Sequence, residues 1–361
     1  MTITVPTYKL PTVLPDSGQD FPEEAIALLQ ELGLMTVTLP SEYGGELLGI
    51  QGGYVELLNI LAVVGSCNLS VGRIYEGHIN ALLLIHTYGN EQQKKRFYGD
   101  AAQGKLFGVW NTERSFEKLK LEDHKGGFVL NGAKIFCSGA LHVQRPIVTV
   151  DGPGGRSMMV LDLDNAEKGM EDWSLWNPMG MEASVSCRID FSGMKVAYDQ
   201  LLGKADDYER EPVFSGGAIR FAAVQMGGSE ALANTVLTHL KKHKRTSDPH
   251  QQLRLGKLVT LVESGKLWLT AAGQMADECD NKNPDIMVNY ANMMRTAIQE
   301  ICEDIIHICE KSIGLQGFMK YHPMEQRYRD LNVYLKQPGP DRAVTSIAKF
   351  ISKRNHTNDV K

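Results

Sequence analysis

The chain has 361 residues, a formal net charge of −5 and a hydrophobic content of 43%. This length exceeds what a single core usually organises, so two or three domains are expected. The slight negative charge offers no basic surface for nucleic acid. The longest apolar runs, near 57–64 and 81–85, are too short to cross a bilayer. These values describe an ordinary globular protein with neither a nucleic-acid nor a membrane partner.

The N-terminus and the cysteines both favour the cytoplasm. Residues 1–15 lack a basic segment followed by an apolar core, so no signal peptide is expected. The six cysteines are scattered along the chain without a CxxC pair. This usage fits reduced thiols better than a disulfide framework or a zinc site. We therefore expect a cytoplasmic protein without a metal.

Residues 1–104 have the patterns of helices and form the first predicted domain. Asp20 and Pro22 precede EEAIALLQELG, which has the signals of a helix start and a glycine stop. Segments 53–65 and 77–101 continue with apolar residues at helical spacing. We expect this domain to be entirely helical.

The pattern changes to strands in the second predicted domain, residues 105–205. Asn131 and Gly132 lie between two apolar runs and predict a hairpin, because both tolerate the positive φ angles of a type I′ turn. A second hairpin is predicted where segments 147–150 and 158–163 flank a DGPGGR turn. We expect a central β domain.

Helices return in the third predicted domain, residues 206–361. Five apolar residues recur there at spacings of three and four: Met294, Ile298, Ile301, Ile305 and Ile308. This spacing predicts a long helix with one buried stripe. The order helical, β, helical makes the chain an α+β protein that is mostly α.

A glycine turn near the C-terminus is the most informative motif. Gly314 and Gly317 are the first and last residues of GLQG. Because neither glycine has a Cβ atom, the backbone amides of this turn can come close to a ligand. Exposed N–H groups in such a turn suit a pyrophosphate or a similar anion. The turn is followed at fixed distance by PMEQRYRD at 323–330.

Together these residues resemble the C-terminal signature of the acyl-CoA dehydrogenase superfamily of FAD flavoproteins. A second block agrees, because LFGVWNTE at 106–113 and GGFVLNGAKIFCSG at 126–139 are similar to the family's wall against the isoalloxazine. Further pieces occur in the family's order: LPSEYGG at 39–45, GNEQQKKRF at 89–97 and MGMEASVSCRIDF at 179–191. The resemblance implies an N-terminal helical domain, a central β-barrel domain and a C-terminal four-helix bundle.

The resemblance also implies an FAD whose reactive edge meets hydrogen-bond donors. Thr112 and Asn111, with the Val109 backbone, would line the pyrimidine side of the ring. Phe136 would pack on the flavin, and Ser138 would offer its hydroxyl near N5. Taken alone, these would be ordinary strand residues. Within the full set of motifs we expect them to bind the cofactor.

The other end of the FAD is implied to depend on a second subunit. Gly314 and Gly317 would face the FAD of a neighbouring subunit, so the site would be complete only in a homodimer or homotetramer. Relatives often carry an arginine that reaches the pyrophosphate. Arg245 is the candidate here and Arg254 is its rival, with a solvated loop charge as the alternative for both.

The family's catalytic base is missing from both of its usual positions. An acyl-CoA dehydrogenase removes the α-proton of a thioester with a carboxylate whose pKa is raised. When Arg329 and Asp330 are aligned with the family, Pro338 stands at one base position. Ile219, immediately ahead of Arg220, stands at the other. Neither Pro338 nor Ile219 ionises.

Three hypotheses follow. In the first, the base has moved to Asp341, Glu76 or His78, and the enzyme acts on the CH–CH group of an acyl thioester such as an acyl-CoA. In the second, the protein is a two-component flavin monooxygenase supplied by a flavin reductase, with His322 or His78 assisting. The third is a flavin-binding subunit without turnover. The expected partners are a small-molecule substrate and a reductase or electron-transfer protein.

Each candidate base also has a structural alternative. Asp341 follows a proline and suits a helix start. His78 suits a semi-buried histidine whose hydrogen bonds are satisfied. Glu76 suits an ion pair with Arg73 on the same helical face.

Overall fold

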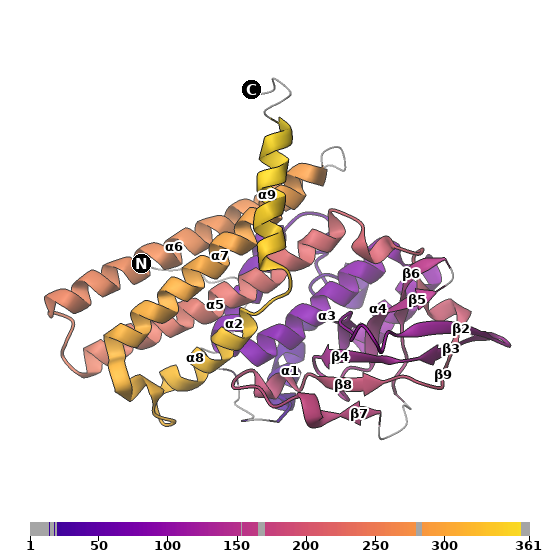
Figure 1. The fold of residues 1–361 in the computed structure, drawn as a ribbon, viewed down its shortest axis with the longest axis horizontal. Coiled ribbons are helices and arrows are strands. Elements are labelled where there is room, and N and C mark those ends of the chain that lie inside the picture. Colours follow the sequence, from indigo (N-terminus) through magenta and orange to yellow (C-terminus); the bar gives the residue numbers. More distant parts are fainter. Residues whose placement is uncertain are drawn as a thin grey trace.

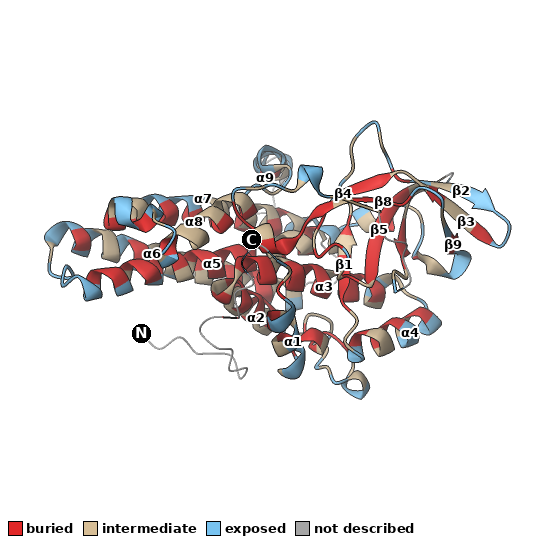
Figure 2. Cartoon of the chain, turned by 90° about the horizontal axis from the view of Figure 1, so that it is seen from below, coloured by how far each residue is buried: buried red, intermediate tan, exposed pale blue. Residues whose placement is uncertain are grey.

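The computed structural model describes Leu14, Gly18 and residues 20–152, 154–164, 170–278 and 284–354. Figure 1 shows long helices at one end of an elongated molecule and the strands gathered at the other. In Figure 2 the buried residues follow the inward faces of the helices and continue into the strands, so a large core joins the two parts. The predicted α+β class, mostly α, is confirmed.

The described N-terminal part contains four α-helices: α1 (Glu23–Glu31), α2 (Tyr54–Cys67), α3 (Leu69–Tyr88) and α4 (Glu91–Ala102). The helices predicted from apolar spacing at 53–65 and 77–101 are confirmed. The glycine stop after α1 is also present, since Gly33 has a φ of 73°. At the start of α1 the N-cap is Pro22, and two glutamates occupy the first turn, where they complement the helix dipole.

The central part consists of β1 (Phe107–Trp110), β2 (Lys120–His124), β3 (Gly127–Asn131), β4 (Ala133–Cys137), β5 (Arg145–Gly152), β6 (Gly155–Val160), β7 (Glu171–Asp172), β8 (Cys187–Asp190), β9 (Met194–Ala197) and β10 (Leu201–Leu202). These strands form two sheets. The larger sheet has the order β10-β6-β5-β2-β3-β9, and β1 pairs with β5 in parallel. The smaller sheet has the order β4-β8-β7.

One of the two predicted hairpins is confirmed and the other is wrong. β5 and β6 pair antiparallel, with Gly152 opposite Gly155 next to the turn. By contrast, β3 pairs with β2 and β9, while β4 pairs with β8 in the other sheet. Gly132 does have the expected positive φ, 116°, but it lies where the chain passes from one sheet to the other. Turn chemistry identified the bend and could not identify the strands that pair beyond it.

The C-terminal part consists of α5 (Val213–Lys242), α6 (Pro249–Glu278), α7 (Pro284–Ile313), α8 (Pro323–Tyr334) and α9 (Pro340–Arg354). The helix predicted around 294–308 is α7, and the first four residues of its predicted stripe are buried. Helices α5, α6 and α7 pack on one another, α8 packs on α5, and α9 projects from the bundle in Figure 1. None of the described helices is long and apolar enough to cross a membrane.

Glycines allow α2 to lie unusually close to α5. A Cβ at Gly227 in α5 would collide with the carbonyl oxygen of Ala62 in α2. A Cβ at Gly65 in α2 would collide with the carbonyl oxygen of Val224 in α5. The two backbones therefore meet directly, which gives extensive van der Waals contact at this crossing. This contact joins the N-terminal helices to the C-terminal bundle.

We expect Gly227→Ala to lower the free energy of unfolding by about 3 kcal/mol. The added Cβ would meet the backbone of Ala62, which cannot move aside as a flexible side chain can. Gly217→Ala in the same helix is the matched control, since nothing lies within 4 Å of a Cβ built there. The control should be stabilised by about 0.5–1 kcal/mol, as for alanine over glycine in a helix. Urea unfolding measures both variants. Equal effects of the two substitutions would contradict the close approach.

Candidate active site

The ring of Phe136 is presented to solvent near the end of β4. The residue is 53% exposed, and its φ is 55°, a backbone conformation that residues other than glycine rarely adopt. Such strain persists only where the surroundings impose it, and it concentrates at functional sites. An exposed aromatic face held in this way can stack on a planar ligand.

A chain of serine hydroxyls orients Ser138 beside this ring. Ser186 donates from Oγ to Ser138 Oγ at 2.9 Å, and Ser184 Oγ lies 2.9 Å from Ser186 Oγ. The indole Nε1 of Trp110 donates to the carbonyl oxygen of Ser138 at 3.0 Å. The Ser138 hydroxyl accepts one hydrogen bond here, so its own hydrogen is available to a ligand. Sequence reasoning missed Ser184 and Ser186, although their spacing of two could have placed them on one face.

The three residues expected at the pyrimidine side lie together but do not all point the same way. The side chain of Thr112 is exposed, and its carbonyl accepts from Ile135 N–H at 2.9 Å. The amide oxygen of Asn111 instead accepts from Thr149 Oγ1 at 2.6 Å. That oxygen is thus engaged within the protein. Val109 is held in β1 by pairing with β5.

Beneath these residues lies a buried ionic cluster with balanced partners. Lys134 has no exposed side-chain area and forms an ion pair with Glu113, whose other oxygen accepts from Arg156 at 2.9 Å. Arg156 also pairs with Asp151 at 3.1 Å. Burial lowers the pKa of Lys134 to about 8, and the ion pair with Glu113 opposes this shift. Each cation pairs with a carboxylate. The cluster also holds the backbone beside it, because Lys134 Nζ donates to the carbonyl oxygen of Asn111 at 3.1 Å.

A second buried polar cluster surrounds Glu76 in α3. Its carboxylate is 3% exposed and forms an ion pair with Arg73, as the helical spacing indicated. Its other oxygen accepts from the side-chain amide of Asn80. On the same helix, a Cβ at Gly77 would lie 4.0 Å from the Cα of Gly108, so this part of α3 lies on β1. Glu76 is therefore close to the sheet that carries Val109.

Arg220 in α5 adds a second guanidinium to this cluster. The residue is 6% exposed, and it donates from Nε to Asn80 Oδ1 and from Nη1 to the hydroxyl of Tyr54. Ile219, at one of the family's base positions, is fully buried. The sequence placed Arg220 beside that position but gave no sign of its neighbours, because they come from α2 and α3.

His78 is held by the backbone at both ring nitrogens. Nε2 lies 2.7 Å from the carbonyl oxygen of Met35, and Nδ1 accepts from Phe107 N–H at 3.1 Å. The tautomer is thereby fixed, with the hydrogen on Nε2. Burial lowers the pKa of His78 to about 4. Neither nitrogen is left for a ligand, which matches the structural alternative for this residue.

Pro338 and Asp341 flank the start of α9. Asp341 is exposed in the first turn of α9, the position expected for a carboxylate at a helix start. The carbonyl oxygen of Pro338 accepts from Arg295 Nη2 at 2.9 Å. Of the three candidate bases, only Glu76 thus combines a carboxylate with burial.

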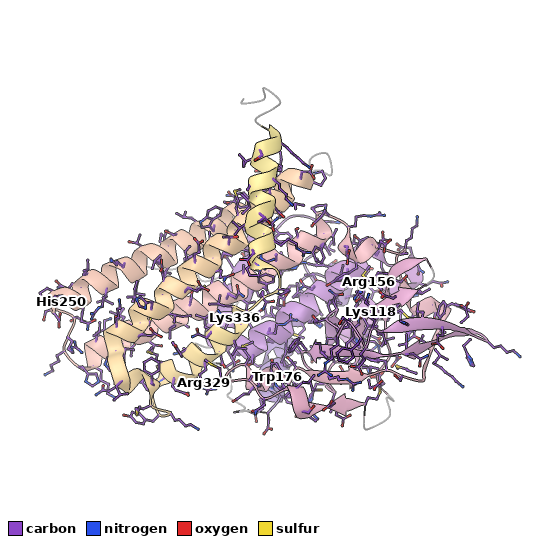
Figure 3. All side chains as sticks on the ribbon, viewed as in Figure 1. Lys118, Arg156, Trp176, His250, Arg329 and Lys336 are labelled. Carbon is purple, nitrogen blue, oxygen red and sulfur yellow. The ribbon has the colours of Figure 1, made fainter. Side chains whose placement is uncertain are left out.

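The residues expected at the pyrophosphate lie at the far end of the bundle. Arg245 follows α5 and pairs weakly with Asp248 at 3.7 Å, and Gly314 and Gly317 belong to the 3-10 helix η7 (Gly314–Phe318) after α7. In Figure 3 His250 marks this end, opposite the strands that carry Arg156. Within one chain these residues are separated from Phe136 and Ser138.

His322 also lies at this far end of the bundle. Its Nε2 is 3.1 Å from His239 Nδ1, and its Nδ1 accepts from Met324 N–H at 3.1 Å as the N-cap of α8. The structure therefore does not bring His322 near Ser138. Among the described residues, no group of three or more histidine, cysteine or acidic side chains could hold a metal ion.

The Arg-Asp pair of the C-terminal signature docks the central domain onto α8. Asp330 Oδ1 accepts from Met181 N–H at 2.6 Å, and Arg329 Nη1 donates to the carbonyl oxygen of Met179 at 2.7 Å. A Cβ at Gly180 would collide with the backbone of Arg329. The motif therefore fixes the loop that leads to the serine chain.

A surface cavity of about 690 Å³ lies beside the same loop. Trp173, Trp176 and Val185 contribute to its lining, and Val185 is the residue between the two serines. Phe21 and His142 stack at 3.8 Å on another side. The cavity has aromatic walls and lies next to the hydroxyls that orient Ser138.

Comparison with protein families places both helical parts of the chain. A model of the acyl-CoA dehydrogenase N-terminal domain matches residues 13–105, and a model of the C-terminal domain of the same family matches residues 211–353. The mitochondrial isobutyryl-CoA dehydrogenase of Dictyostelium discoideum is 23% identical over 94% of this chain and 84% of its own. A dibenzothiophene monooxygenase of Rhodococcus erythropolis is 25% identical over 60% of this chain and 55% of its own.

Solved structures share the fold. The FMN-bound TdsC of Paenibacillus superposes with a TM-score of 0.83 at 16% identity, covering 93% of this chain and 92% of its own. The butyryl-CoA dehydrogenase of Megasphaera elsdenii superposes with a TM-score of 0.80 at 19% identity, covering 92% and 91%. The predicted fold, with its helical N-terminal part, central sheets and C-terminal helices, is thus confirmed.

The depressed pKa of His78 gives the protein an acid-sensitive stability. His78 stays neutral in the folded state down to about pH 4, whereas in the unfolded chain it takes up a proton below about 6.5. The unfolded state therefore binds more protons in this window, and stability falls as the pH is lowered through it, by about 3 kcal/mol at most from this residue. His78→Gln should flatten that part of the profile of unfolding free energy against pH. The control His124→Gln, at an exposed site, should keep the parent's slope; a parental slope in His78→Gln would contradict the assignment.

Removal of the Glu113 carboxylate, which pairs with both Lys134 and Arg156, should destabilise the buried ionic cluster. Glu113→Gln leaves Lys134 buried without an acid, and we expect a loss of about 3–5 kcal/mol in unfolding free energy. The double variant Glu113→Gln, Lys134→Met removes the stranded charge and should recover much of that loss. Urea unfolding of the two variants tests this, and a double variant as unstable as the single one would rule out the stranded cation as the cause.

Proposed function

This chain belongs to the acyl-CoA dehydrogenase family and is a flavin-dependent oxidoreductase, and we propose that it oxidises the CH–CH group of an acyl thioester with Glu76 as the base. One observation carries this proposal: Glu76 is a buried carboxylate on the part of α3 that lies against β1. A base that removes a weakly acidic α-proton must be excluded from water and close to the reacting carbon.

The residues of the sheet region fit FAD. Phe136 offers a flat exposed ring, Ser138 offers a hydroxyl oriented by Ser186, and the side chain of Thr112 is exposed beside them. The bound cofactor would take up the hydride from the β-carbon of the substrate. The chain's own contribution is to hold the ring by stacking and to place hydrogen-bond donors at its polar edge.

A second copy of the chain would complete the cofactor site. In Figure 1 the turn between α5 and α6, which carries Arg245, and the segment between α7 and α8, which carries Gly314 and Gly317, lie at the end of the bundle away from β4, the strand of Phe136. This separation supports a homodimer or homotetramer in which each copy supplies the pyrophosphate contacts of its neighbour. The substrate's electrons would pass on to an electron-transfer or reductase partner. The five described cysteines form no disulfide, which supports a cytoplasmic setting.

Glu76 would act by exchanging one of its present hydrogen bonds. Arg73 and Asn80 engage its two carboxylate oxygens. The side chain of Arg73 is 26% exposed, so it can move aside toward solvent more easily than the buried carboxylate. An oxygen freed in this way would accept the α-proton of the substrate.

Both oxygens of the Glu76 carboxylate already have partners, and this favours a second candidate function, a two-component flavin monooxygenase. Such a reaction needs no α-proton abstraction, which agrees with Pro338 and Ile219 at the family's base positions. In this case Glu76 would serve only to hold Arg73 and Asn80. The similarity to a dibenzothiophene monooxygenase supports this alternative.

The dehydrogenase proposal is tested by adding a panel of acyl-CoA thioesters to the flavin-loaded protein without oxygen. We expect at least one thioester to bleach the flavin absorbance, and Glu76→Gln to slow bleaching by about 10²–10⁴-fold, the usual contribution of a general base. Glu230→Gln is the matched control, because Glu230 pairs with Lys266 elsewhere in the bundle.

Three results separate the functions. Bleaching that Glu76→Gln leaves unchanged would reject Glu76 as the base. Absence of bleaching by every thioester, with ¹⁸O from labelled oxygen entering a substrate when a flavin reductase is present, would establish the monooxygenase. Neither reaction, in a protein that binds flavin, would indicate a subunit without turnover.

A further inference from the structure

We propose that the polar cluster around Glu76 recognises an oxyanion of the substrate, such as a carboxylate, and that Arg220 and Tyr334 provide the contacts. The proposal deepens the function above and rests on it, because it takes this cluster as part of the substrate pocket. It assigns the substrate class as a small acid, or an acyl group that ends in an acid.

Arg220 is a buried cation without an acidic partner. Both of its hydrogen bonds go to neutral oxygens, those of Asn80 and Tyr54. No acidic side chain of the described residues forms an ion pair with it, and none accepts a hydrogen bond from Nη2. A guanidinium taken out of water costs several kcal/mol unless an anion compensates it. The planar fork of arginine suits a carboxylate that binds through two oxygens.

The fold makes room for this guanidinium. A Cβ at Gly216, one turn before Arg220 in α5, would lie 3.1 Å from Arg220 Nη1 and 3.4 Å from the hydroxyl of Tyr54. Any larger side chain would press on the pair. Tyr54 is itself held in place, because its N–H donates to the carboxylate of Asp277 at 2.9 Å. The guanidinium is thus positioned by neutral groups and left with an uncompensated charge.

Tyr334, at the end of α8, supplies a second unused donor. The residue is 3% exposed, and its hydroxyl has no hydrogen-bond partner among the described residues. Burial, and then the negative charge of Glu76, raise its pKa well above the ordinary value, so the hydroxyl keeps its hydrogen. A buried hydroxyl without a partner destabilises the folded protein, because its hydrogen bond to water is lost and not replaced. A ligand oxygen would remove that cost.

The charge of the whole cluster favours an anion. Arg73 forms an ion pair with Glu76, and Arg220 joins the same cluster through Asn80, which bonds both Glu76 and Arg220, so two guanidinium groups share one carboxylate. Tyr208 and Tyr334 also face Glu76 and Arg73, and burial raises the pKa of both hydroxyls, that of Tyr208 to about 12, so both stay neutral. The partly exposed side chain of Arg73 gives access from solvent.

A purely apolar acyl chain fits this cluster poorly. It would remove the remaining water from Arg220 and Tyr334 and offer no acceptor in return. A site that is built to hydrogen-bond a substrate group discriminates strongly against the analogue that lacks it, because the protein's own polar groups then stay unpaired. The preference for an acid over its neutral analogue is therefore the measurable property.

Binding is measured first, with propionate and its neutral isostere propionamide as probes, on the flavin-loaded protein at constant ionic strength. Changes in the flavin spectrum and in the melting temperature give the two dissociation constants. We expect propionate to bind at least about 10-fold more tightly than propionamide, and Arg220→Gln to remove that difference, since hydrogen bonds between charged groups are stronger than those between neutral ones. Arg220→Lys should restore part of it.

Tyr334→Phe separates a binding role from a structural one. Its hydroxyl has no partner in the protein, so its removal should leave the melting temperature unchanged or raised. Propionate binding should nevertheless weaken by about 3–10-fold, the value of one hydrogen bond. Tyr88→Phe is the matched control, because the buried hydroxyl of Tyr88 also lacks a partner. That variant should leave propionate binding unchanged.

The proposal is overturned if the acid and the amide bind equally, if Arg220→Gln keeps the preference, or if Tyr334→Phe binds propionate as Tyr88→Phe does. Turnover distinguishes it from the proposed function. If neutral acyl thioesters bleach the flavin as fast as the mono-thioester of a dicarboxylic acid, the dehydrogenase stands and the oxyanion site fails. If propionate binds through Arg220 and no thioester bleaches the flavin, the oxyanion site stands and the dehydrogenase fails.

Discussion

The backbone contact between α2 and α5 is the constraint on which the site depends. Gly65 and Gly227 let the two helices meet without intervening side chains. Only Asn68 separates α2 from α3, and its side chain caps α3 by accepting from Val71 N–H at 3.1 Å. The position of α2 therefore sets that of α3, which lies between the bundle and β1. Through this chain of contacts, packing between two helices determines where Glu76 stands relative to the sheets.

The two buried ionic clusters differ in balance, and this difference separates support from recognition. In the cluster below β1, Lys134 and Arg156 share Glu113, and Asp151 adds a second acid. These cations and carboxylates form ion pairs with one another within the protein. In the cluster on α3, Arg73 takes the carboxylate of Glu76, and Arg220 is left with neutral partners. An imbalance of this kind inside a protein is costly, and a ligand of opposite charge is the simplest way to offset it.

The motifs that identified the family act in two ways in the structure. The Arg-Asp pair at 329–330 binds the central loop at Met179 and Met181, so this part of the signature holds the domains together. The strand motifs instead present Phe136 and Ser138 at the surface of the site. The residue pattern predicted that both segments matter, because each repeats a family spacing. The pattern could not tell a contact between domains from a contact with the cofactor, since that depends on which groups lie next to the motif in the folded protein.

The sequence by itself determined the α+β order, the long helix with its buried stripe, the family and the absence of its usual base, because these depend on local periodicity and on residue identity. Only the tertiary structure decided that Asn131-Gly132 joins two sheets, that His78 is held by backbone at both nitrogens, and that Arg220 meets Tyr54 and Asn80. The hydrogen-bond partners of His78 and Arg220 lie 29 to 166 positions away in the chain. Hydrogen-bond partners and burial are properties of neighbours in space, and the order of residues does not specify them until the helices and sheets have packed.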